Sequence, residues 1–299
     1  MSPTQYTYTG QYSYTADFGL MFYNARWYDP YLKRFAQADT IVPPGAQGLD
    51  RYLYALNSPI QYKDPSGHCQ QRTNRTMVTF TSEGQDWTQQ EMDVVCQQIY
   101  NVAIAEAKMI NSRNYLLWRM GEIDSYRPIG PSTALYTIHN GPIEAVRSNE
   151  TPGWAAYTRS ENEIVFYNIR TPDGTIITNY VANHPRLVTH EMGHAVINAF
   201  GINEATDINI PSDLLRPLMG DSSIDHLNDI NGAVDPNEPF FGYAGGFEDY
   251  QFGYIGSRWR EEFADMFVGW VYHFGDTPMG AQRNAFMQLT MVNLVDLIP

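Results

Sequence analysis

The chain is poor in cysteine and in charge, and it contains no long apolar run. Its 299 residues include two cysteines, Cys69 and Cys96, which excludes a disulfide-rich scaffold and a four-cysteine zinc site. No stretch approaches the roughly 18 uninterrupted apolar residues of a membrane helix, so we expect no membrane span. The start, MSPTQYTYTG, lacks the basic and apolar segments of a secretory signal, so we expect no cleavable signal peptide in this chain. The 43% hydrophobic share is typical of a folded protein.

Basic residues are also scarce, and they are unevenly distributed. The chain has 19 Lys and Arg against 33 Asp and Glu, a formal net charge of −14. Up to position 75 the balance is +2, and over the rest of the chain it is −16. A phosphate-binding surface needs clustered Lys and Arg, so the acidic second part argues against nucleic acid as a partner and against a nuclease.

The first part of the chain differs from the rest in composition. Ten of the 21 tyrosines precede position 69, among glycines and Asp-Pro pairs, a pattern typical of short strands joined by turns. The polar run HCQQRTNR then follows the turn at 64–67. We therefore predict a β-rich unit over 1–68, a linker with a first strand over 69–84, and a second domain over 85–299.

Two runs in the first part carry a family resemblance. The runs YTGQYSYTADFGLMFYNARWYDPYLKRFAQAD and LDRYLYALNSPIQYKDPSGH resemble the RHS repeat-associated core of bacterial RHS and YD-repeat toxins, over residues 7–68. The resemblance implies that this chain is the tail of a longer protein, with a variable effector after the DPSG turn. It also implies a secreted or delivered bacterial effector, and as partners the RHS shell of the parent chain and an immunity protein.

The same resemblance suggests a site of self-cleavage. In that family the core cuts the chain just past the turn, with aspartates of two Asp-Pro words and a nearby arginine. The corresponding candidates here are Asp39, Asp64 and Arg34, although Asp39 is followed by Thr40 in place of Pro. The alternative is that these aspartates only cap turns.

Beyond the linker the pattern changes to helices with a small sheet. Thr88 and Glu91 stand at capping-box spacing before an apolar pattern of helical period, which predicts a helix over about 89–111. Cys96 lies on its apolar face, so we expect a plain core thiol. Further along, strands over 163–169 and 175–180 are predicted to form a hairpin around 171–174.

The next predicted helix carries the chemistry. It begins at Pro185, ends at Gly201 and contains the motif HEMGH at 190–194, which includes His190, Glu191 and His194. Residues four apart project from one face of an α-helix, so both imidazoles can reach one Zn²⁺ while Glu191 leans to the same side. The pattern predicts a zinc site with Glu191 as a general base.

A catalytic zinc needs a third protein ligand and a position for water. Glu261 is the best candidate, and Asp265, four residues later, is placed to accept the N–H of a ligating histidine. Glu262 is a competing ligand, but it loses this four-residue spacing. The alternative reading of the segment is an exposed acidic helix face.

The two segments that contain these candidate residues resemble a second known family. HEMGHAVINAFG and YIGSRWREEFADMF resemble the gluzincin group of zinc metallopeptidases, and more narrowly the catalytic domain of anthrax lethal factor and its relatives. In that group a tyrosine seven residues before the glutamate ligand stabilises the oxyanion, which implies this role for Tyr254.

Together the patterns predict an α+β chain: a short β-rich RHS core fragment followed by a zincin-like metallopeptidase domain of helices on a small mixed sheet. The predicted function is a zinc-dependent endopeptidase toxin that hydrolyses a protein substrate in a target cell. The segment 202–253 is expected to form a lid or cleft wall. The alternative is a non-enzymatic encapsulated binding module with a structural metal.

Overall fold

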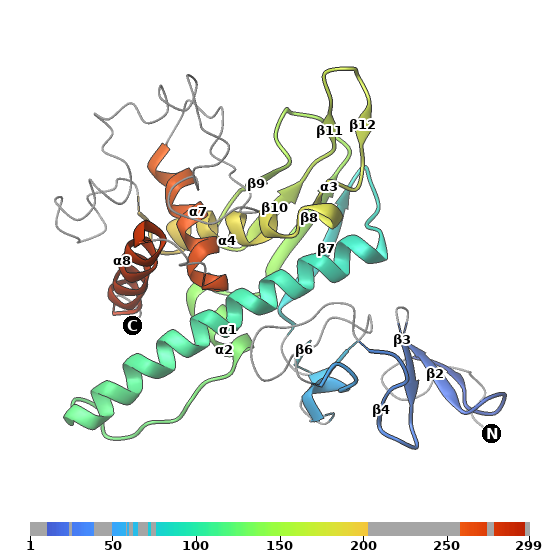
Figure 1. Ribbon diagram of the computed structural model, residues 1–299, viewed down its shortest axis with the longest axis horizontal. Coiled ribbons are helices and arrows are strands. Elements are labelled where there is room, and N and C mark those ends of the chain that lie inside the picture. The colour runs from blue at the N-terminus through green and yellow to red at the C-terminus, as the bar shows by residue number, and fades with distance from the viewer. Residues whose placement is uncertain are drawn as a thin grey trace.

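The fold combines helices with several small sheets, which confirms the predicted α+β class (Figure 1). The computed structural model describes residues 11–23, 26–38, 50–57, 59, 62–64, 71–72, 76–202, 258–273 and 278–296. Most of the predicted lid segment 202–253 therefore lies outside the described residues. Among the described helices, none has the length and apolar character needed to cross a membrane.

The first part of the chain forms an antiparallel sheet with its own small core. Its strands follow one another in sequence order: β1 (Tyr12–Tyr14), β2 (Leu20–Tyr23), β3 (Arg26–Asp29) and β4 (Arg34–Phe35). The buried side chains here form a cluster separate from the main core, and most are aromatic: Met21, Tyr23, Tyr28, Phe35, Tyr54 and Ala55. The 3-10 helix η3 (Ala55–Asn57) contributes the last of these.

A small hairpin lies across the position where the domain boundary is predicted. Strand β5 (Tyr62–Lys63) pairs antiparallel with β6 (Gln71–Arg72), so the chain on both sides of position 68 meets in one sheet. The domain limits remain a prediction.

The second part is built on a four-stranded mixed sheet. Its spatial order is β7 (Val78–Glu83), β8 (Ile143–Ser148), β10 (Glu163–Phe166) and β9 (Ala156–Thr158). The first three strands are parallel, and β9 runs antiparallel to β10 at the edge. A parallel pair needs a long crossover, and here helices α1 (Gln89–Met120) and α2 (Pro131–His139) connect β7 to β8.

The predicted hairpin around 171–174 is confirmed, but both of its strands are shorter than expected. The hairpin is made by β11 (Ile169–Arg170) and β12 (Ile176–Ile177). The predicted strand 163–169 is divided between β10 and β11. Asn168, which lies between them, is buried and its side-chain oxygen accepts a 2.8 Å hydrogen bond from Arg147. The backbone N–H of Asn168 donates to the backbone oxygen of Glu150 at 3.0 Å, outside the strand ladders.

Helix α1 starts where predicted and ends nine residues later. Both bonds of the capping box between Thr88 and Glu91 are present. The end predicted at 111 is wrong, because the helix continues to Met120, where Gly121 takes the left-handed conformation (φ 79°) and closes it. Figure 1 shows this last part of α1 extending away from the other helices, which explains why the apolar pattern fades before the helix ends.

The expectation for Cys96 is corrected in one respect. The residue is buried on the apolar face of α1, as predicted, but it is disulfide-bonded and not a free thiol. The only other cysteine in the sequence, Cys69, lies outside the described residues.

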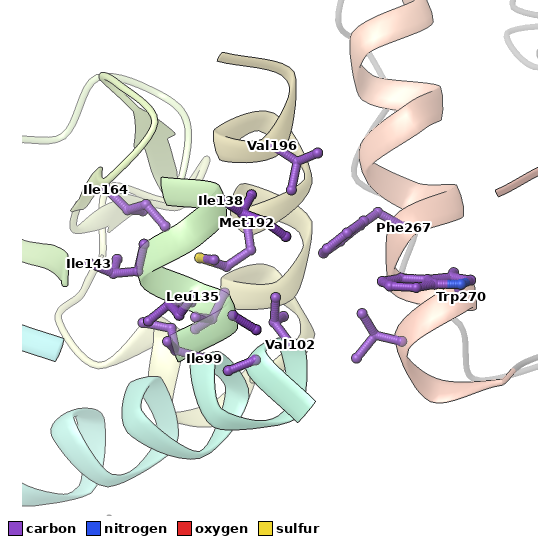
Figure 2. Close-up of a cluster of buried hydrophobic side chains, with 14 of the residues drawn as sticks. Ile99, Val102, Leu135, Ile138, Ile143, Ile164, Met192, Val196, Phe267 and Trp270 are labelled. Carbon is purple, nitrogen blue, oxygen red and sulfur yellow. The ribbon is translucent and has the colours of Figure 1, made fainter. Parts of the chain in front are cut away.

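Helices and the four-stranded sheet together enclose the main core of the described residues. Side chains of α1, α2, α4 (Arg186–Ala199) and α7 (Arg258–Tyr272) point toward one another and toward β8 and β10 (Figure 2). The last described helix, α8 (Pro278–Val295), has a proline at its first position, and α3 (Tyr180–Asn183) is a single turn before α4. Helices α1 and α2 are also joined by a buried polar contact, 2.9 Å between Glu106 Oε1 and His139 Nε2.

Candidate metal centre

Helix α4 holds both predicted histidine ligands on one side. It runs from Arg186, directly after Pro185, and Gly201 follows it with a φ of 62°, as predicted. The imidazole rings of His190 and His194 have their centroids 4.9 Å apart and their planes at 84°. Two imidazoles at this separation are within reach of one metal ion, because zinc–nitrogen distances are about 2.0–2.1 Å.

Asp265 contacts His190, one of the two histidines predicted as metal ligands. Its Oδ1 lies 2.8 Å from His190 Nδ1, and both side chains are almost fully buried. With Nδ1–H donating to the carboxylate, Nε2 is the nitrogen that would bind a metal. An outer carboxylate that orients a ligating imidazole is a common part of zinc sites, so this pair fits zinc.

The third predicted ligand is placed only by its backbone. Glu261 belongs to α7, one helical turn before Asp265, and its side chain lies outside the described residues, as does that of Glu262. Tyr254 also lies outside them. Within the described side chains, no group of three metal-binding residues is present. The described part of the centre therefore consists of the two histidines, Glu191 and Asp265.

A close helix crossing holds α7 against the HExxH turn, and sequence reasoning missed it. A Cβ added at Gly193 would lie 2.8 Å from the Cα of Ala264 and 3.2 Å from Phe267 Cβ. At the far ends of the same helices, Arg260 donates to Asn198 Oδ1 at 2.6 Å. Glycine in a helix interior costs about 1 kcal/mol relative to alanine, so Gly193 itself was the available signal of a tight contact.

A partly buried polar group, the hydroxyl of Tyr272, joins three helices. The Tyr272 hydroxyl on α7 contacts Thr189 Oγ1 at 3.2 Å, Asn101 Nδ2 at 3.4 Å and the Gln98 side-chain oxygen on α1. Burial raises the pKa of the Tyr272 phenol, with the hydrogen bonds of Thr189 and Asn101 opposing that shift. The Tyr272 hydroxyl thus connects α7 and α1 to Thr189, the residue before His190. No sequence motif predicts this contact.

The predicted general base contacts the edge strand of the sheet. Thr158 Oγ1 on β9 lies 2.7 Å from Glu191 Oε2 and 2.9 Å from the backbone oxygen of Glu191. Both residues are buried, with 7% and 5% of their surface exposed. Sequence reasoning did not single out Thr158, since nothing local distinguishes it from other strand threonines.

The structure describes two of the three self-cleavage candidates, Asp64 and Arg34. Asp64 is buried, and its carboxylate lies 3.3 Å from the guanidinium of Arg26, which is also buried. Arg34 instead pairs with Asp50 at 2.7 Å. Asp39 lies outside the described residues. The arginine beside Asp64 is therefore Arg26, from the word NARWYDP, and not Arg34.

No protein-family model, curated protein or solved structure matches the chain.

Proposed function

We propose that the second part of the chain is a zincin-type zinc endopeptidase. The observation that carries the proposal is the arrangement on α4 and α7, in which the rings of His190 and His194 lie 4.9 Å apart and Asp265 contacts His190 from the neighbouring helix. The HExxH spacing alone gives the first half of this arrangement. The 2.8 Å contact to a buried carboxylate on another helix is independent of it.

The residues around the centre have separate roles in peptide hydrolysis. Zinc, when bound, supplies a water of lowered pKa and polarises the peptide carbonyl. Glu191 takes the proton of the attacking water as general base and returns it to the leaving amine. In this proposal His190, His194 and Glu261 hold the metal, Asp265 orients His190, and Tyr254 donates a hydrogen bond to the oxyanion.

The edge of the sheet offers a place for an extended substrate. Among the described strands, β9 pairs with β10 alone, so its outer edge presents backbone N–H and C=O groups beside α4. An extended peptide can add to such an edge through main-chain hydrogen bonds. Its scissile bond would then lie next to Glu191, which Thr158 of β9 contacts directly.

The biological setting follows from the resemblance of residues 7–68 to the RHS core. We infer a toxin effector that acts on a protein of a target cell, travels with the RHS shell of its parent chain and is neutralised by an immunity protein. If the core also cuts its own chain, Arg26 is the arginine that the structure places beside Asp64.

The proposal is tested with the full 299-residue chain loaded with zinc and a peptide library. We expect peptide cleavage that a chelator abolishes and added zinc restores. Glu191→Gln should retain zinc and lose cleavage, because the amide cannot take the proton. Cleavage by Glu191→Gln at the wild-type rate would refute the assignment. Bound zinc without any cleavage by the wild type would indicate a structural metal in a binding module.

A further inference from the structure

Strand β9 holds the carboxylate of Glu191 through one side chain. Side chains along β9 alternate, with Ala156 and Thr158 buried and Tyr157 exposed, so Thr158 faces inward beside α4. Its hydroxyl lies within hydrogen-bond distance of two oxygens of the same residue, the carboxylate Oε2 and the backbone oxygen of Glu191. A hydroxyl has a single hydrogen, and an ionised carboxylate is the stronger acceptor.

This contact restricts how the Glu191 side chain can rotate. The hydroxyl of Thr158 donates to the end of the Glu191 side chain, so the carboxylate is held in place relative to β9. Among the described residues, Oε1 of Glu191 accepts no hydrogen bond, whereas Oε2 accepts that of Thr158. One oxygen is therefore anchored while the other is the one that would face the attacking water.

We propose that Thr158 is a positioning residue for the general base Glu191. The inference rests on the proposed peptidase function and adds a residue to it. Its consequence is specific: the anchor acts on the orientation of the base and does not touch substrate or metal. Loss of the anchor should therefore lower kcat and leave KM and zinc binding nearly unchanged.

The size of the effect follows from the geometry. A displacement of about 1 Å in a catalytic group costs on the order of 100-fold in rate, and a carboxylate released from a 2.7 Å hydrogen bond can rotate by at least that much. We expect Thr158→Val, which keeps the side-chain shape but not the hydroxyl, to lower kcat by about 10- to 100-fold. Thr158→Ser keeps the hydroxyl and should recover most of this loss.

The opposite edge of the same sheet offers a matched control. Thr81 on β7 also donates its hydroxyl to a glutamate carboxylate, Glu144 Oε1, at 3.2 Å. Thr81→Val therefore removes the same kind of bond, between the same residue types, away from the centre. We expect its kcat to equal that of the wild type.

The experiment compares these variants in the full chain, with a fluorogenic peptide chosen from those that the wild type cleaves. It measures kcat, KM, zinc content and the thermal midpoint. If Thr158→Val does not fold, the pair Thr158→Ser and Thr158→Ala replaces it, since these two differ only by the hydroxyl. A low kcat for the variant without a hydroxyl, with recovery in Thr158→Ser and unchanged zinc content, supports the proposal.

Two kinds of failure are distinguishable. An active wild type, an inactive Glu191→Gln and a Thr158→Val with wild-type kcat would overturn the role of Thr158 and leave the peptidase standing. The same holds if Thr158→Ser is as impaired as Thr158→Val, or if zinc is lost in proportion to activity. A wild type without chelator-sensitive cleavage would overturn both proposals together.

Discussion

The packing of α7 on α4 predicts that Gly193→Ala disturbs the metal centre through its outer carboxylate. Gly193 lies inside the HExxH word, between Glu191 and His194, and its backbone meets the backbone of Ala264 on α7. A methyl group at 193 would contact a Cα atom, which cannot rotate away as a side chain can. The two helices must therefore move apart.

The size of the movement can be estimated from the contact distances. Carbon atoms pack at about 3.5–4.0 Å, so an added Cβ that lies 2.8 Å from Ala264 Cα requires a shift of about 0.7–1.2 Å. Added methyl groups in packed cores cost about 1–3 kcal/mol, offset here by the gain of about 1 kcal/mol for alanine over glycine in a helix. A shift of about 1 Å in α7 would lengthen the 2.8 Å bond from Asp265 to His190 beyond hydrogen-bond range.

Two measurements on Gly193→Ala check this reasoning. We expect the free energy of unfolding of the metal-free protein, from denaturant titration, to fall by up to about 2 kcal/mol. Zinc affinity, from competition with a chelating indicator, should fall by about 10- to 100-fold, as it does when an outer ligand is lost. Gly193→Val should lower both the free energy of unfolding and the zinc affinity further than Gly193→Ala does. A Gly193→Ala protein that is more stable than the wild type and binds zinc equally well would show that α7 does not pack here as described.

Three further predictions concern single contacts. Asp265→Ala should weaken zinc retention by about 10- to 100-fold without emptying the site. Asp265→Asn can still accept a hydrogen bond from His190 and should weaken zinc retention less. The metal content of each variant after dialysis checks both expectations. Arg147→Met breaks the buried ion pair between Arg147 and Glu91 and should lower the free energy of unfolding in urea by about 3–5 kcal/mol. Arg159→Met breaks the partly exposed pair with Glu83 and should lower it by at most about 1 kcal/mol. Equal losses in the two variants would contradict the argument from burial. Burial raises the folded-state pKa of Tyr272 above 10, so the contribution of this phenol to stability is complete below pH 10 and is lost as the pH rises through the folded-state pKa. The difference in unfolding free energy between wild type and Tyr272→Phe should therefore shrink at alkaline pH. A difference that stays constant with pH would contradict this role of Tyr272.

Local signals in the sequence predicted the starts of the helices well. The capping box at Thr88 marks the start of α1, Pro185 marks the start of α4, and Gly201 marks the end of α4. Each of these signals acts within one turn of the chain, so a sequence can be read for it directly. The end of α1 was missed because its last turns leave the core, and the apolar period stops before the helix does.

Contacts between distant segments were predicted only where chemistry demanded a partner. A histidine that binds a metal commonly needs an outer acceptor, which directed attention to Asp265, 75 residues from His190. The resemblance to the RHS core suggested Arg34 as the arginine of the self-cleavage site, whereas the structure places Arg26 beside Asp64 because β3 carries that side chain into the small core.

The contact between Thr158 and Glu191 shows why the sequence alone could not predict the remaining part of the site. Thr158 pairs with Ile164 of β10 in a register that only the folded sheet defines, and β9 is joined to the rest of the sheet through β10, which pairs with β8. The position of the base therefore depends on the sheet being complete, from β7 to the edge strand. A change that loosens β9, even far from the histidines, should lower turnover before it lowers metal binding, whereas a change at the crossing of Gly193 and Ala264 should reduce metal binding first.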